Sequence, residues 1–149
     1  MPSERQRPRR TARPLGDERT DARERSLLLL YEAASKSVSP VQVLDAQIVE
    51  PDALTREIVS GVEADRERLD AVIAAHAKGW TLQRMPLIDL TIMRIAGYEL
   101  SARADVPVAV IIDEAVELAK RFSTDDSGRF VNGVLAAMVP TLRVPAVDR

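Results

Sequence analysis

Apolar residues recur three and four positions apart along most of residues 17–140, which is the spacing of one buried face of an α-helix. The densest stretch lies between Ala22 and Ala33 and predicts a first, central helix that begins at Asp17 or Thr20. The same spacing is repeated in five later segments, around residues 40–48, 52–77, 86–100, 107–122 and 127–139. The pattern therefore predicts an all-α protein with about seven helices joined by short loops.

Several of these helices have recognisable start signals. Ser39 is expected to cap a helix in which Pro40 needs no N–H partner and Gln42 completes a capping box. Val41, Leu44 and Ile48 would then share one helix face. The sequence around Asp52 restarts a helix, and the apolar pattern over 52–77 fits either one helix or two.

The second half of the chain follows the same logic. Pro86 and Pro107 each mark a helix start. The run 108–112 is the best strand candidate, but it continues without interruption into the helical DEAVELAK and is interpreted as helix. The final helix is predicted to run from about Ser127 to Val139 and to end at Pro140, which lacks the N–H that would continue it.

Composition restricts the class of protein. The 149 residues are 46% hydrophobic, 30% charged and 3% aromatic, and they contain no cysteine, which excludes disulfides and thiolate metal sites. No apolar run approaches the ~20 residues of a membrane span, and no apolar segment precedes Leu27, so a cytoplasmic protein is expected. Residues 1–16 predict a disordered, arginine-rich arm, 17–140 the folded domain, and 141–149 a C-terminal tail.

The net charge of −2 conceals an asymmetry. Residues 1–25 contain eight arginines and five acidic residues, a net charge of +3, whereas the rest of the chain has a net charge of −5. Arginine presents a planar set of donors suited to phosphate and to stacking on bases. A basic arm on an acidic body favours local contact with nucleic acid, although a solvated arginine-rich tail would give the same composition.

Candidate catalytic groups do not form a recognisable set. The single histidine, His76, lies on an apolar helix face, and no second histidine could share a metal. Asp113 and Glu117 share a helix face with basic neighbours and are interpreted as a solvated surface. Phosphate-binding glycine loops are absent. No enzyme activity, cofactor or metal is expected.

The segment FSTDDSGRFVNGVL (122–135) is the most unusual. Ser127 is predicted to cap its helix, with Arg129 and Phe130 projecting from a start whose free N–H groups attract phosphate. Phe130 could stack on an unpaired base, or it could belong to the core. A glycine inside a helix costs ~1 kcal/mol, so Gly133 predicts a close helix approach, or a buried hydrogen bond from Asn132.

Taken together, four segments resemble the NusB family of transcription antitermination factors: DARERSLLLLYEA (21–33), LIDLTIMRIAGYEL (87–100), DVPVAVIIDEAVELAKRF (105–122) and STDDSGRFVNGVL (123–135). The last two, read continuously, carry the specific signal. The resemblance covers about residues 20–140 and implies two small helical bundles packed together, without enzyme activity.

The resemblance also implies partners. Family members bind the boxA element of leader RNA together with NusE, a small-subunit ribosomal protein, and load onto RNA polymerase to support ribosomal RNA synthesis. By position it implies these RNA-binding residues: Arg19, Arg23, Tyr31, Asp89, Arg94, Asp126, Arg129 and Phe130. NusE contacts are expected around residues 80–100. Members occur as monomers and as dimers, so a homodimer is an open alternative.

This chain departs from the family where members often have adjoining arginines, because it has Thr20 and Asp21 there. The departure favours one alternative function, a helical protein–protein adaptor with weakened RNA binding. A second alternative is the RNA-positioning module of ribosomal RNA methyltransferases, against which the chain length argues. For Tyr31 the alternative role is a core aromatic, and for Arg94 it is an ion pair with Asp89 or Glu99.

Overall fold

Two groups of helices make up the protein, and one helix of the second group packs against both. The computed structural model describes residues 17–144, so the predicted arm 1–16 and residues 145–149 of the tail lie outside it. Within residues 17–144 there are seven α-helices, one short 3-10 helix and no strand, which confirms the predicted all-α class. The elements are α2 (Asp17–Lys36), α3 (Pro40–Asp45), α4 (Ala53–Ala64), α5 (Arg66–His76), η2 (Leu82–Arg84), α6 (Leu87–Ala102), α7 (Val108–Phe122) and α8 (Asp125–Leu142).

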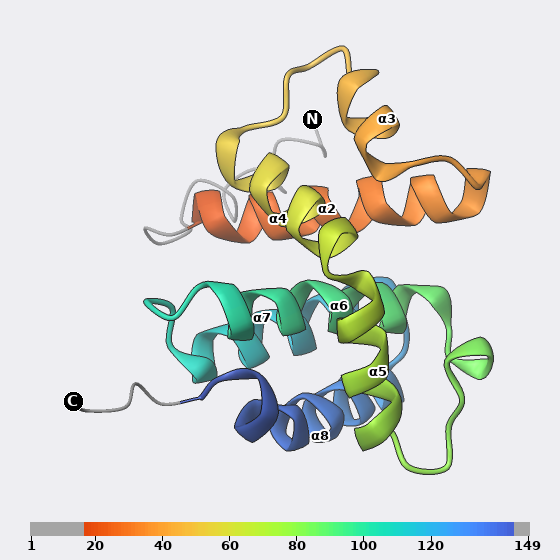
Figure 1. Cartoon of the computed structure of the whole chain (residues 1–149), viewed down its shortest axis with the longest axis vertical. Coiled ribbons are helices and arrows are strands. Elements are labelled where there is room, and N and C mark those ends of the chain that lie inside the picture. Colours follow the sequence, from red (N-terminus) through yellow and green to blue (C-terminus); the bar gives the residue numbers. More distant parts are fainter. Residues whose placement is uncertain (1–16, 145–149) are drawn as a thin grey trace, which may run out of the picture.

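The two bundles share a single core built around α6. Figure 1 shows α2, α3 and α4 as an upper group and α5 to α8 as a lower group. Helix α6 packs against α2 and α4 above and against α7 and α8 below. Its side chains Ile92 and Met93 are at most 1% exposed, as are Leu27 of α2, Ile58 of α4 and Leu135 of α8. Aliphatic burial on this scale is the main force that holds the bundles together.

Two predicted start signals are confirmed. The Ser39 hydroxyl accepts a hydrogen bond from the Val41 N–H at 3.1 Å, and the Gln42 side chain accepts one from the Ser39 N–H at 3.1 Å. Asp52 caps α4 by accepting from the Thr55 N–H at 2.8 Å, and this bond holds the pKa of the Asp52 carboxyl below its usual value. Ile48 lies beyond the end of α3 and is fully exposed, so the prediction that it shares a helix face with Val41 and Leu44 was wrong.

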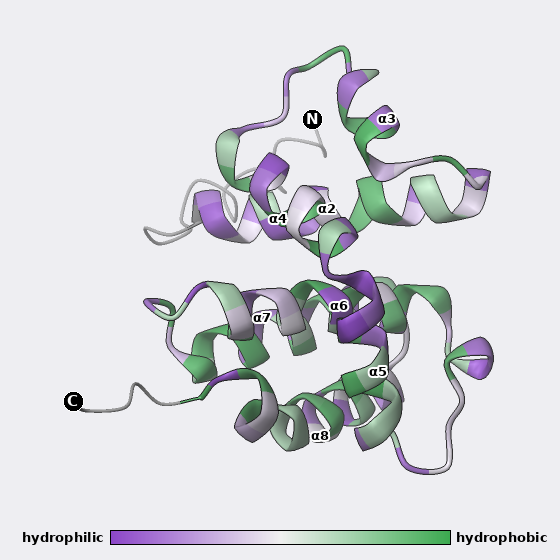
Figure 2. Ribbon diagram, viewed as in Figure 1, coloured by the Kyte–Doolittle hydropathy of each residue, from purple (hydrophilic) through white to green (hydrophobic). Residues whose placement is uncertain are grey.

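The segment 52–77 forms two helices. Asp65 ends α4 with φ −111° and ψ 17°, and α5 starts at the next residue. Arg68 donates to the Asp65 carboxylate at 2.6 Å and to the Ser101 hydroxyl of α6 at 2.7 Å. Figure 2 shows this junction as a hydrophilic stretch between the two bundles. The break turns the chain from the upper bundle to the lower one.

The end of α8 differs from the prediction. The helix continues through Pro140 to Leu142, because a proline in the last turn removes only one hydrogen bond and the Leu142 side chain is buried. Arg143 then donates to four backbone carbonyls at and just after the end of α6, at 2.6–3.1 Å. The Glu99 and Arg103 carbonyls also accept backbone N–H groups, at 2.9 and 3.0 Å, so Arg143 adds to the hydrogen bonding at the end of this helix. The last helix therefore ends at Leu142, two residues beyond the predicted end at Pro140.

The close helix approach also lies elsewhere than predicted. Gly133 is exposed, and a methyl group there would meet nothing within 4 Å. Asn132 beside it is exposed as well and makes no buried hydrogen bond. The tight approach is instead at Gly61 of α4, where a methyl group would overlap the ring of Tyr98 on α6. Gly61 thus lets the upper bundle approach the central helix.

Candidate nucleic-acid interface

The start of α8 is organised by Thr124 and not by Ser127. Thr124 has the extended backbone of a cap, and its hydroxyl accepts from the Ser127 N–H at 3.1 Å. Asp125 and Asp126 follow in the first turn, where negative charge is favoured by the helix dipole. The predicted cap was wrong because Ser127 is already inside the helix, and its hydroxyl is used in a buried contact.

That contact joins the starts of α8 and α6. The Ser127 hydroxyl donates to the Asp89 Oδ2 atom at 2.8 Å, and both side chains are at least 94% buried. The other carboxylate oxygen of Asp89 is buried without a hydrogen-bond partner among the described residues. Asp89 is therefore a poor candidate for direct contact with RNA in this conformation. Its position fixes where α8 begins relative to the central helix.

Arg129 and Asp126 form the exposed part of the same turn. The Arg129 guanidinium donates to the Asp126 carboxylate at 2.6 Å, and the two side chains are 84% and 87% exposed. Pairs at such exposure are worth little, because water and salt screen them. The arginine can thus exchange its carboxylate for a phosphate at small cost.

Phe130 has the core role that the sequence offered as one of two alternatives. It packs half-buried against the core and also contacts Trp80, with 5.6 Å between ring centroids and an interplanar angle of 57°. Trp80 is 47% exposed. Trp80 was not among the residues predicted from the sequence, although its position directly after Gly79, at a helix end, is typical of an exposed residue.

The three predicted residues of α2 differ sharply in exposure. Arg19 is exposed and Tyr31 is 38% exposed, so both are accessible. Arg23 is 4% exposed and donates two hydrogen bonds to the Glu99 carboxylate, at 2.7 and 2.9 Å. Burial by itself lowers the pKa of Arg23. The hydrogen bond to Glu99 and the negative charges of Glu99 and Glu114 raise it by more, so the pKa lies above its usual value. The Arg23 side chain is therefore not accessible to solvent. It joins α2 to α6 through its hydrogen bonds to Glu99.

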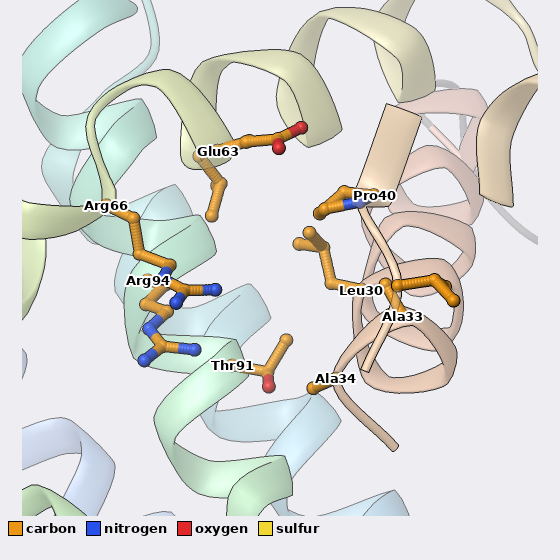
Figure 3. Close-up of a pocket in the computed structure, with 10 residues that line it drawn as sticks. Leu30, Ala33, Ala34, Pro40, Glu63, Arg66, Thr91 and Arg94 are labelled. Atoms are coloured by element: carbon orange, nitrogen blue, oxygen red, sulfur yellow. The ribbon is translucent and has the colours of Figure 1, made fainter. Parts of the chain in front are cut away.

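Arg94 lines a cleft between the bundles. It pairs with Asp70 of α5 at 2.7 and 3.0 Å, and not with Asp89 or Glu99 as the structural alternative supposed. Figure 3 shows Arg94 and Arg66 on one side of the cleft, facing Leu30 and Pro40 across it. Arg94 is thus a partly buried arginine whose charge is balanced within the protein.

Other candidate chemistry does not assemble in residues 17–144. The His76 ring nitrogen lies 2.9 Å from the Val72 carbonyl oxygen of its own helix. No group of three or more histidine, cysteine or acidic residues in that range could hold a metal ion. None of the helices described is long and apolar enough to cross a membrane. The accessible polar and aromatic groups at the start of α8 are the strongest candidate site.

The fold and this surface define an all-helical protein with a candidate nucleic-acid interface at the start of its last helix. Residues 20–140 match the family model described as the NusB family. The transcription antitermination protein NusB of Saccharopolyspora erythraea is 49% identical over 123 residues, which cover 78% of this chain and 83% of that protein. The chain belongs to the NusB family.

Solved structures agree with this assignment. A structure of T. maritima NusB aligns with a TM-score of 0.74 at 29% identity, over 81% of this chain and 89% of that one. A crystal structure of the antitermination factors NusB and NusE in complex with dsRNA contains a chain that aligns with a TM-score of 0.73 at 21% identity, over 85% and 99% of the two chains. The NusB-like fold implied by the resemblance is thereby confirmed.

Proposed function

We propose that this protein is a transcription antitermination factor that binds boxA leader RNA together with NusE and supports ribosomal RNA transcription by RNA polymerase. The observation that carries the proposal is the family match over residues 20–140, together with the name of its 49% identical relative. The structure of NusB and NusE with dsRNA concerns a more distant chain, but it supports the choice of both partners for testing.

On this proposal, RNA contacts come from the accessible members of the predicted set. Arg129 and Phe130 offer a phosphate donor and an aromatic ring on adjacent positions of α8, with Asp126 as the exchangeable partner of the arginine. Arg19 and Tyr31 offer similar groups on α2. Arg23, Asp89 and Arg94 have structural roles on this proposal, since their charged groups are already bonded inside the protein.

The test is the affinity for a boxA-containing leader RNA and for a scrambled RNA of equal length, with and without NusE, at low and moderate salt. The proposal expects selective binding of the boxA RNA that NusE strengthens and salt weakens, because phosphate contacts release counterions. Light scattering of the free protein and of the complex distinguishes a monomer from a homodimer. Equal, weak binding of both RNAs would contradict a boxA-specific function.

One observation favours the adaptor as a second candidate. Thr20 and Asp21 occupy positions where the family often has arginines, and Arg23 is buried. Together these leave the described part of α2 with fewer exposed cations than its sequence suggests. A tight NusE complex without RNA selectivity would favour this alternative.

A further inference from the structure

Trp80 is the only tryptophan of the chain, and it lies in the loop between α5 and α6. Figure 1 shows this loop projecting from the lower bundle. Gly79 has φ +80°, a left-handed conformation that glycine adopts without strain, and the Trp80 N–H then donates to the Ala77 carbonyl at 3.0 Å. This turn brings the indole to the surface, where it is 47% exposed.

The exposed indole is held in place by the start of α8. Its ring centroid is 5.6 Å from that of Phe130 in a tilted arrangement typical of aromatic pairs. Phe130 is in turn packed against the core. Trp80 therefore extends the aromatic surface of Phe130 outward, and it directly adjoins the residues that carry the proposed function.

The loop around Trp80 is basic although the body of the protein is acidic. No acidic residue occurs between Asp70 and Asp89, whereas Lys78 and Arg84 lie within four residues of Trp80. Both are exposed, and neither has an ion-pair or hydrogen-bond partner among residues 17–144. Uncompensated cations beside an exposed aromatic ring are the combination that single-stranded nucleic acid binds, by stacking of its bases and pairing of its phosphates.

We propose that Trp80 is a second stacking surface for an unpaired RNA base, beside Phe130, and that Lys78 and Arg84 contact the phosphates on either side of that base. The proposal rests on the proposed function and deepens it, since it adds a basic aromatic loop to the RNA interface. Stacking of this kind tolerates any base, so Trp80 would contribute affinity more than sequence selectivity.

The surroundings of Trp80 favour RNA over a protein partner. Thr81 and Gln83 are exposed between the two cations, and Leu82 is only partly exposed. The loop thus presents one aromatic ring among polar groups. A protein-docking surface would be expected to have a wider, continuous apolar patch.

Because Trp80 is the only tryptophan, all tryptophan emission of the protein reports on this site. Unlabelled single-stranded boxA RNA should quench that emission and saturate at the RNA concentration at which an end-labelled copy of the same RNA saturates in anisotropy. Trp80→Ala should weaken RNA binding about tenfold or more, whereas Trp80→Phe should retain most of the affinity, because a phenyl ring can still stack.

A matched control is Val110→Ala, which shortens another apolar side chain, 42% exposed, at the far end of α7 from the α7–α8 turn. It should bind RNA like the wild type. A Lys78→Gln, Arg84→Gln double variant should reduce the slope of log affinity against log salt by about one to two, as expected for the loss of two phosphate contacts. Circular dichroism of each variant checks that the fold is retained.

The outcomes separate the two proposals. An increase in the anisotropy of the labelled RNA without any change in tryptophan emission, together with an unaltered affinity of Trp80→Ala, would overturn the role of Trp80. It would leave the proposed function intact. No anisotropy change with wild-type protein would overturn the proposed function and this inference with it. Emission that changes on addition of NusE alone, and not of RNA, would assign the loop to a protein contact and overturn the inference.

Discussion

Arg23 and Arg129 occupy equivalent places in the sequence prediction and opposite places in the structure. Both are arginines near a helix start, both were expected to contact RNA, and both pair with a carboxylate. The Arg23–Glu99 pair is at least 95% buried, whereas both side chains of the Arg129–Asp126 pair are more than 80% exposed. The difference teaches that a shared charge and a shared family position do not define a shared role. Burial decides whether an arginine stabilises the protein or remains available to a ligand.

The largest effect is expected for Arg23→Ala. Removing the guanidinium leaves the Glu99 carboxylate buried, with only Arg103 nearby at 3.5 Å, which should lower the free energy of unfolding by about 3–5 kcal/mol. Urea denaturation followed by circular dichroism measures this loss. An Arg23→Met, Glu99→Leu double variant serves as the control and should recover much of it, because no unpaired charge remains. A loss below about 1 kcal/mol for Arg23→Ala would make the buried pair unimportant.

A smaller effect is expected for Ser127→Ala. This variant tests whether the start of α8 depends on the buried Ser127–Asp89 hydrogen bond. The change removes the one hydrogen-bond donor to the Asp89 carboxylate among residues 17–144 and should cost about 1–3 kcal/mol of unfolding free energy. Thermal denaturation measures the loss. Ser123→Ala is the control, because its hydroxyl contacts the Ser127 hydroxyl at 2.9 Å but does not reach Asp89. Equal effects of the two variants would refute a specific role of the Ser127–Asp89 bond.

Gly133→Ala should act in the opposite direction. Gly133 lies in the middle of α8 with open space around it, so alanine should stabilise the protein by roughly 0.5–1 kcal/mol through better helix propensity. Gly61→Ala is the contrasting variant, because a methyl group there meets Tyr98 and must destabilise. If Gly133→Ala lowers the unfolding midpoint instead, α8 does not have the conformation described here.

The sequence predicted most of the fold because its start signals are local. Ser39, Pro40 and Gln42 specify a capping box through contacts within four residues, and the structure forms it as expected. Periodicity likewise assigned residues 108–112 to a helix. Features that depend on tertiary contacts could not be predicted from such local signals. Whether α8 passes Pro140 depends on burial of Leu142 and on the bonds of Arg143 to α6.

The candidate site shows the same division. The sequence placed Asp126, Arg129 and Phe130 at the start of the last helix, as observed, but it did not predict their environment. Ser127 lies inside the helix and bonds to Asp89, 38 residues away along the chain, whereas Thr124 has the extended backbone of the cap. Arg94 found its partner in Asp70, 24 residues away, rather than among its helical neighbours. A single sequence contains no signal for such pairings, because they depend on which helix faces are brought together.

The central claim is that the exposed Arg129 contacts RNA, whereas the buried Arg23 stabilises the protein. Its most direct test is the salt dependence of RNA affinity for the wild type and for Arg129→Ala. Arg129→Ala should change the free energy of unfolding by no more than about 0.5 kcal/mol, because its side chain is exposed. It should nevertheless weaken boxA RNA binding about tenfold and reduce the salt slope by about one, as the loss of one phosphate contact requires. Unchanged affinity and an unchanged slope in a fully folded Arg129→Ala protein would contradict the account.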